Sequence, residues 1–153
     1  MAIATAESLA TLFTDDETAW LEAMADLIRL RDLAALDLEN LAEYLADMAR
    51  RDRREVKSRL VVLLTHLLKW EFQPEKRSRS WRTTILSQRQ ELADLASRGV
   101  LRTHAETVLP AAYENAVELA AAETGVPAAT FPKDCSLTLE QLLVIDVSNA
   151  ETA

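Results

Sequence analysis

The segment 38–72 contains neither glycine nor proline, and the first helix-breaking residue after it is Pro74. Proline lacks a backbone N–H and its ring clashes with the preceding turn, so it kinks a helix or ends it. Apolar residues recur at the spacing of one helix face, at positions 38, 41, 45, 48, 56, 60, 63, 67 and 70. Over 60–68 nearly every side of such a helix is apolar, which requires neighbouring helices all round. We therefore expect a long helix over 38–72, capped by Asp37, at the centre of a bundle.

Shorter apolar patterns with start and stop signals predict four more helices. Their expected ranges are about 15–31, 81–97, 102–123 and 139–145. The expected N-cap residues are Thr14, Ser80 and Thr138. Gly99 and Gly125 are expected to end the second and third of these helices, and Pro110 to kink the third or to begin a new one. The predicted fold class is all-α, a compact bundle of four main helices and a short C-terminal helix around one long central helix.

A length of 153 residues suits one domain. We expect a flexible N-terminal segment over 1–12, a single helical domain over 13–146 and a flexible tail over 147–153. One cysteine, Cys135, cannot form an intrachain disulfide, which favours a reducing compartment. A signal peptide requires basic residues near its start, and no basic residue precedes Arg29. No apolar run approaches the roughly 20 residues of a membrane span. A cytoplasmic protein with no membrane association is expected.

Several kinds of site are excluded by residue counts and spacing. Two glycines are too few for a dinucleotide-binding fingerprint or a P-loop. Neither His66 nor His104 has a glutamate three residues before it, the spacing that helical bundles use for carboxylate-bridged metals. No serine or cysteine lies beside an oriented base. We expect no metal and no cofactor, and no catalytic residue is assigned.

Charge is distributed very unevenly along the chain. Residues 50–82 hold eleven basic and four acidic side chains, a net charge of +7. The remaining residues hold six basic and twenty-one acidic side chains, a net charge of −15, so the whole chain carries −8. Four of the cations project from one side of the long helix within an arc of about 100°. This basic face consists of Arg50, Arg53, Arg54 and Lys57.

A second basic cluster, Arg77, Arg79 and Arg82, surrounds the start of the helix that Ser80 is expected to cap. Free N–H groups and the positive end of the helix dipole favour an anion at such a place. The sequence therefore predicts an anion or partner-binding site formed by the three arginines and Ser80.

Three polar residues, Asp52, Arg59 and His66, are spaced seven apart and form a polar seam along one side of the long helix. Adjacent members are about 10 Å apart by helix rise, so they cannot touch directly. His66 has two possible roles. It is either a buried neutral imidazole bonded to a neighbouring helix, or a general acid or base acting on a phosphate ester.

Three stretches carry a resemblance to a known family. They read LDLENLAEYLADMARRDRREVKSRLVVLLTHLLKWEFQPEKRSRSWRTTI (residues 36–85), AYENAVELAAAETGV and FPKDCSLTLEQLL. Over about 13–146 the chain resembles the bacterial family called domain of unknown function 29, and HLLKWEFQPEKRSRSWR is the most specific block. The resemblance implies a small cytoplasmic all-helical protein and supplies no activity, cofactor or catalytic residue. Family members often have a glycine followed by a serine where this chain has Ala49 to Arg53, so a straighter helix is expected.

Three functions are compatible with these residues. The first is a binding module whose two basic clusters engage an anionic partner, either nucleic acid or an acidic protein, with Trp70 and Trp81 as stacking surfaces or as core residues. The second is a structural self-associating bundle, such as a homodimer, in which the charges are paired internally. The third is a nuclease-like enzyme using His66, which has the least support because the sequence shows no partner for this histidine.

Overall fold

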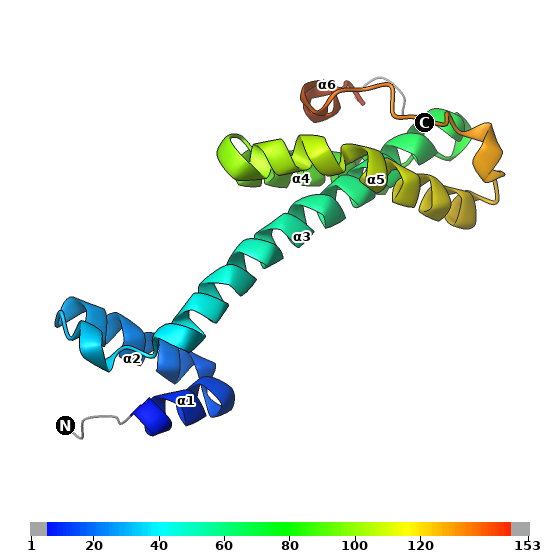
Figure 1. Ribbon diagram of the computed structural model, residues 1–153. Coiled ribbons are helices and arrows are strands. Elements are labelled where there is room, and N and C mark those ends of the chain that lie inside the picture. The colour runs from blue at the N-terminus through cyan, green and yellow to red at the C-terminus, as the bar shows by residue number, and fades with distance from the viewer. Residues whose placement is uncertain (1–5, 148–153) are drawn as a thin grey trace. The chain divides into compact units, whose positions relative to one another are not determined.

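The computed structural model describes residues 6–147, and every regular element in that range is a helix or a helical turn (Figure 1). The helices are α1 (Ala6–Asp15), α2 (Glu17–Arg29), α3 (Leu38–Phe72), α4 (Arg79–Leu95), α5 (Gly99–Thr124) and α6 (Leu139–Val144). The short 3₁₀ turns are η1 (Leu33–Ala35), η2 (Pro74–Lys76) and η3 (Ala128–Thr130). The all-α prediction is confirmed, and α3 has the predicted bounds.

The chain divides into two compact units, and the division lies inside α3, between Arg50 and Arg51. The N-terminal unit contains α1, α2 and the first turns of α3, and the C-terminal unit contains the rest of α3 with α4, α5 and α6. Each unit has its own cluster of buried apolar side chains. The single domain expected over 13–146 stays a prediction. The expectations for residues 1–5 and 148–153 lie outside the described residues.

One tryptophan organises the N-terminal unit. Trp20 of α2 has no exposed surface, and its ring centroid lies 4.7 Å from that of Phe13 in α1 and 5.9 Å from that of Tyr44 in α3. Its indole N–H donates to the Asp37 carboxylate at 3.1 Å. The other buried residues of the described part of this unit are Leu9 and Met24. A single indole therefore joins three helices.

Asp37 opens α3 as predicted, although its side chain acts differently. Its backbone carbonyl accepts the Leu41 N–H at 2.9 Å, which is the first bond of the helix. Its carboxylate accepts from the side chains of Trp20 and Asn40. The charge at the start of α3 thus also fixes the tryptophan of α2.

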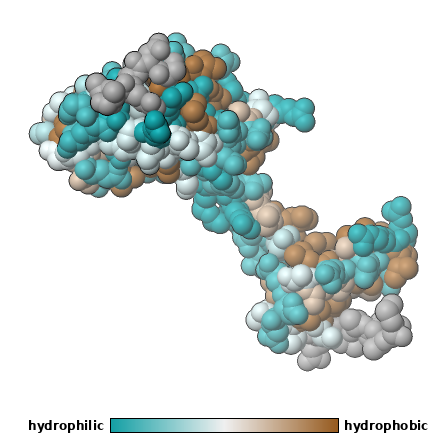
Figure 2. Space-filling model, turned by 180° about the vertical axis from the view of Figure 1, so that it is seen from behind, coloured by the Kyte–Doolittle hydropathy of each residue, from teal (hydrophilic) through white to brown (hydrophobic). Residues whose placement is uncertain are grey.

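The N-terminal unit leaves several large apolar side chains in solvent, and Figure 2 shows brown, hydrophobic surface on the face of this unit that it presents. The exposed fractions are 72% for Leu30, 59% for Leu33, 64% for Leu38 and 60% for Leu45. Exposed apolar surface marks interaction sites in soluble proteins where it is contiguous.

The start of α2 differs from the prediction. The N-cap is Asp16 rather than Thr14, because the Asp16 carboxylate accepts the Ala19 N–H at 3.1 Å. Thr14 lies in the last turn of α1, where the Asp16 N–H bonds to the Leu12 carbonyl at 2.7 Å. α1 occupies part of the segment that was expected to be flexible. Its Leu9 side chain is buried in the core of the unit, a tertiary contact that the periodicity of so short a segment does not reveal.

α3 also supplies the centre of the core in the C-terminal unit. Its fully buried side chains there include Val56, Leu60 and Leu63. Leu64, Leu67 and Leu68 are also buried, as expected for a segment that is apolar on nearly every side. At the C-terminal end of α3, the Phe72 ring meets the Phe131 ring edge to face, with centroids 5.0 Å apart.

α5 packs into this core through small side chains. Its alanines without exposed surface are Ala105, Ala112, Ala116 and Ala120. Alanine carries no side chain beyond Cβ, so the α5 backbone can lie close to its neighbours. Pro110 is part of α5 and does not end it, so of the two outcomes predicted for this residue, a kink or a new helix, the new helix is wrong.

Two predicted helix ends need correction. Ser78 caps α4, because its hydroxyl accepts the Trp81 N–H at 3.2 Å, and Ser80 lies in the first turn of the helix. Ser78 is favoured because η2 leaves it with extended backbone, which an N-cap requires. α4 ends at Leu95 with Ala96 as its C-cap, so Gly99 does not end it. Gly99 has a φ of 70° and begins α5 after the chain has reversed direction.

The other two helix-end predictions are confirmed. Gly125 closes α5 in the left-handed conformation, with a φ of 75°, and its N–H bonds to the Ala121 carbonyl at 2.9 Å. Thr138 and Gln141 form the expected capping box at the start of α6. These two ends position α6 and the loop before it.

Candidate functional site

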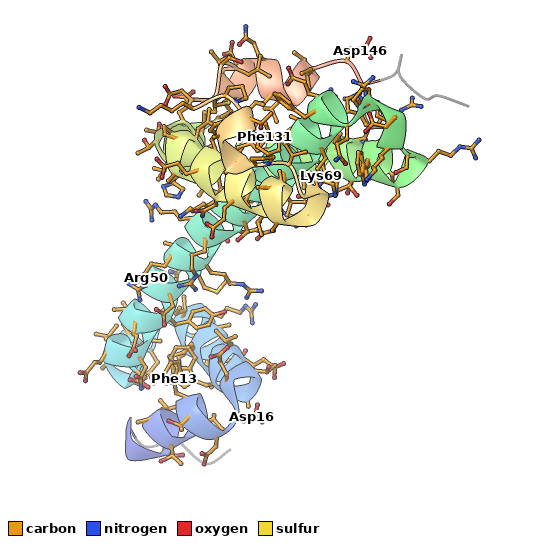
Figure 3. All side chains as sticks on the ribbon, turned by 90° about the vertical axis from the view of Figure 1, so that its right-hand side faces the viewer. Phe13, Asp16, Arg50, Lys69, Phe131 and Asp146 are labelled. Carbon is orange, nitrogen blue, oxygen red and sulfur yellow. The ribbon has the colours of Figure 1, made fainter. Side chains whose placement is uncertain are left out.

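The basic face predicted on α3 is only partly free. Arg50, labelled in Figure 3, forms an ion pair with Asp47 one turn earlier, within the N-terminal unit. Both side chains are more than half exposed, so this pair contributes little stability, but it offsets the charge of Arg50.

The other three members of the basic face, Arg53, Arg54 and Lys57, all belong to the C-terminal unit. None of them makes a hydrogen bond or an ion pair with any residue in 6–147. Arg54 is exposed, whereas Arg53 and Lys57 are half-buried. We call these residues the unpaired trio, because they present positive charge that the described part of the chain does not neutralise.

Arg59 shows the opposite arrangement two residues further along α3. Its guanidinium lies 2.9 Å from the Glu55 carboxylate and 3.7 Å from the Glu91 carboxylate. It also donates to the Gln88 amide oxygen at 3.4 Å. Internal charge pairing therefore accounts for Arg50 and Arg59 but not for the unpaired trio.

An open groove lies beside Arg53 in the C-terminal unit, bordered by the first turns of α5. Arg102 also lines it, and this side chain is engaged by Glu106 at 2.9 Å and by Glu140 at 3.3 Å. Among the arginines that border the groove, Arg53 therefore supplies the positive charge without a carboxylate partner.

The predicted anion site at the start of α4 lacks one of its expected arginines. The Arg77 side chain points to the end of α3, where its Nε–H donates to the Trp70 carbonyl at 2.6 Å. Its guanidinium carbon lies 5.1 Å from the centroid of the Trp70 ring. Arg77 therefore stabilises the turn between α3 and α4.

The remaining residues of this cluster lie on the surface of α4. Arg79 and Ser80 are exposed, and Arg79 and Arg82 border a small open hollow with Thr83 and Leu86. Anion binding at this place stays a prediction, and Arg82 already interacts with another group of the protein.

The two tryptophans considered as stacking surfaces are engaged with the protein itself. Trp70 is 6% exposed, and Trp81 packs against the core cluster. The Lys69 ammonium lies 4.6 Å from the Trp81 ring centroid and 2.8 Å from the Glu123 carboxylate. These contacts favour the core interpretation of both rings.

The polar seam is not brought together. Asp52 is half-buried and makes no hydrogen bond or ion pair with residues 6–147, and Arg59 is held by the partners described above. His66 is half-buried, and its Nδ1 lies 2.9 Å from the Val62 carbonyl one turn earlier in α3. The expected bond to a neighbouring helix is therefore wrong, because the imidazole donates to its own helix.

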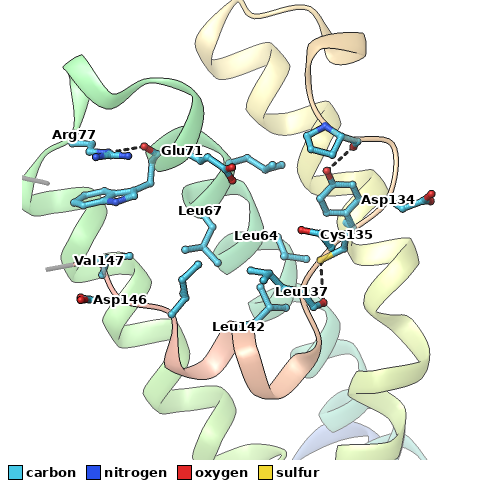
Figure 4. A pocket seen from close by; sticks show the side chains of 16 residues that line it. Leu64, Leu67, Glu71, Arg77, Asp134, Cys135, Leu137, Leu142, Asp146 and Val147 are labelled. Atoms are coloured by element: carbon cyan, nitrogen blue, oxygen red, sulfur yellow. Dashed lines mark hydrogen bonds between the residues drawn. The ribbon is translucent and has the colours of Figure 1, made fainter. Parts of the chain in front are cut away.

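The sequence did not predict a pocket of about 390 Å³ inside the C-terminal unit. Figure 4 shows Leu64, Leu67, Leu137 and Leu142 converging around its centre, with Glu71 beside them. Other residues that line it are Arg77, Tyr113, Asp134, Cys135, Ile145, Asp146 and Val147. Its walls come from α3, from α5, and from the loop and helix at residues 132–147.

One arginine of α4 holds the wall formed by α6. The Arg89 Nε–H donates to the Leu143 carbonyl at 2.8 Å, and its Nη1 donates to the Ile145 carbonyl at 2.6 Å. These carbonyls belong to the end of a helix, where backbone acceptors have no partner within the helix. Arg89 therefore satisfies them and holds α6 against α4, which keeps the pocket formed.

The pKa of Tyr113 reflects the burial and the negative charges around the pocket. Its hydroxyl donates to the Pro132 carbonyl at 2.5 Å. Burial raises the pKa of Tyr113 above the ordinary value of 10.0, and the negative charges of Cys135, Glu71 and Asp134 raise it further. The carboxylates thus create a negative potential on this side of the pocket.

We expect the stability of the protein to fall with rising pH above about 10 because of Tyr113. The folded state holds the phenolic proton to a higher pH than the unfolded chain, so between the two pKa values unfolding releases a proton. Tyr113→Phe should remove this alkaline loss and cost about 1 kcal/mol at neutral pH, because the bond to Pro132 is lost. Urea unfolding from pH 8 to about 11 measures both effects.

The control for this experiment is Tyr44→Phe, which replaces the second of the two tyrosines and lies in the N-terminal unit. Tyr44→Phe should still lose stability at alkaline pH through Tyr113, as wild type does. Equal pH dependence in wild type and Tyr113→Phe would refute the prediction.

Comparison with known proteins agrees with the resemblance seen in the sequence. A family model described as "Domain of unknown function DUF29" matches residues 12–147. The chain belongs to the DUF29 family. No curated protein and no solved structure matches the chain. For a DUF29 protein, function must therefore be inferred from the site itself.

Two further features of this DUF29 chain concern metal ligands and the apolar character of its helices. Within residues 6–147, no three or more histidine, cysteine, aspartate or glutamate side chains are grouped so that they could hold a metal ion. None of the helices in that range combines the length and the apolar character that a membrane span requires.

Proposed function

We propose that this DUF29 protein is a non-catalytic interaction module that binds an anionic macromolecule through the unpaired trio on α3. The observation that carries the proposal is that Arg53, Arg54 and Lys57 have no carboxylate partner in the described part of the chain. Unpaired cations that share one side of a helix are suited to contact successive phosphates or carboxylates.

The overall negative charge is compatible with this function because the charge is segregated. Residues 51–82 hold ten basic and four acidic side chains, a net charge of +6. Residues 1–50 carry −8 and residues 83–153 carry −6. Ionic strength in cells screens charges beyond about 8 Å, so an anion near the trio responds mainly to the local positive charge.

The test is retention of the protein on duplex DNA and on polyglutamate at several salt concentrations. Each phosphate contact lowers log affinity by about 0.9 per unit of log salt. Replacing all three residues of the trio with glutamine should therefore reduce the slope on DNA by up to about 2.7. Retention on polyglutamate but not on DNA would assign the site to an acidic protein.

The matched control is Lys133→Gln, which removes a cation that is exposed and has no carboxylate partner within residues 6–147. It should leave the slope unchanged. The proposal fails if wild type binds neither polymer, or if the trio variant binds as wild type does.

Self-association is the second candidate, supported by a different observation. The N-terminal unit exposes several leucines and has only three buried apolar residues among those described. Covering this surface with a second copy would bury apolar area at about 25 cal/mol per Å². Sedimentation at several protein concentrations tests it, with Leu38→Glu and Leu45→Glu expected to yield a monomer. A concentration-independent monomer in wild type would exclude self-association.

A further inference from the structure

The pocket in the C-terminal unit is large enough for a small organic molecule. Its volume of about 390 Å³ falls within the range of roughly 300–1,000 Å³ that is typical of ligand sites. Its centre is lined by leucines from α3, from α6 and from the loop before α6 (Figure 4). An apolar centre of this kind favours a ligand with an apolar body.

The charged groups around the pocket are mostly negative. Glu71 and Asp134 line it, and Arg77 is the one basic side chain among its lining residues; Asp146 also lines it but already interacts within the protein. The Arg77 guanidinium is already used by the Trp70 carbonyl and the Trp70 ring. Glu71 makes no hydrogen bond or ion pair with residues 6–147, so its carboxylate is available to a ligand.

We propose that this pocket binds a small organic amine, with the ammonium group at the Glu71 carboxylate and the apolar body against Leu64, Leu67 and Leu142. A charge-assisted hydrogen bond from the ammonium to Glu71 orients the ligand, and the leucines exclude water from its apolar part. The site lies apart from the unpaired trio and does not depend on the function proposed for it.

Two features of the surrounding structure support this ligand class. Burial is the main cause of the raised pKa of Tyr113, and the charges of Glu71 and Asp134 add to it; these two carboxylates also favour a cation beside them. The two bonds from Arg89 hold the α6 wall in place without a ligand. Binding therefore requires little ordering of the protein, which favours affinity.

The experiment uses three probes of similar shape and different charge: 2-phenylethylamine, 2-phenylethanol and 3-phenylpropionate. Calorimetry on the full chain should give the tightest binding for the amine, weaker binding for the alcohol and the weakest for the carboxylate. Cys135 lines the pocket and is the single cysteine of the chain, so its alkylation by iodoacetamide reports on occupancy. The amine should slow this alkylation.

The variant Glu71→Gln keeps the size of the side chain and removes its charge. It should weaken amine binding about tenfold and leave alcohol binding unchanged, as expected for one charge-assisted hydrogen bond. The control Glu75→Gln changes an exposed carboxylate that does not line the pocket, and it should bind the amine as wild type does. Both positions are exposed, so circular dichroism should show the same helix content in both variants.

Several results would overturn the proposal. They are absence of amine binding at millimolar concentration, equal binding of the amine and the alcohol, and preference for the carboxylate. Amine binding that leaves the alkylation rate of Cys135 unchanged would also overturn it, because the ligand would then lie elsewhere.

Discussion

Replacing Trp20 with alanine should lower the free energy of unfolding of the N-terminal unit by about 3–5 kcal/mol, the range for removing a fully buried aromatic side chain. Trp20 has no exposed surface and contacts rings from α1 and α3. The change would also leave the Asp37 carboxylate without its indole donor. Because this unit has few other buried residues, little else can compensate.

Limited digestion with trypsin measures the loss of stability that Trp20→Ala causes in the N-terminal unit. Arg29 and Arg31 lie in that unit, and cleavage after them should accelerate when the unit opens. Trp20→Phe is the matched variant, because it keeps an aromatic ring and loses only the N–H donor. It should cost about 1 kcal/mol. A loss below about 1 kcal/mol for the alanine variant would show that Trp20 does not hold the unit together.

Leu63→Ala should cost about 2–5 kcal/mol in the C-terminal unit, because a fully buried leucine in a packed core leaves a cavity that its neighbours cannot fill. Leu67→Ala should fall at the low end of that range. Leu67 is 9% exposed and borders the existing pocket, so its removal enlarges a space that is already open. Urea unfolding followed by circular dichroism compares the two variants. Equal losses would contradict the difference in packing.

The helices that the sequence predicted well are those with a strong local signal. The bounds of α3 were correct because a long apolar periodicity ends at Pro74. The ends at Gly125 and Thr138 were correct because each has one residue suited to the position. The start of α4 was wrong because Ser78 and Ser80 are both good N-caps, and only the preceding turn decides between them.

The candidate site was less predictable for a different reason. The Asp47–Arg50 and Glu55–Arg59 pairs are three and four residues apart on one helix, so their spacing was visible in the sequence. The contact of Arg59 with Glu91 and the turn of Arg77 toward Trp70 depend on how α3 and α4 pack. The pocket joins residues from 64 to 147, and no local pattern indicates such a junction.

The buried alanines of α5 have a consequence for the alignment of this helix with its neighbours. If α5 shifted by one residue, with a rise of about 1.5 Å and a rotation of about 100°, Glu106, Tyr113 and Val117 would take the places of Ala105, Ala112 and Ala116. A carboxylate and two larger side chains would then have to fit where the core accepts only a methyl group. The small residues therefore disfavour this shift and favour the observed position of α5. That position in turn sets where Tyr113 meets Pro132 and the pocket forms.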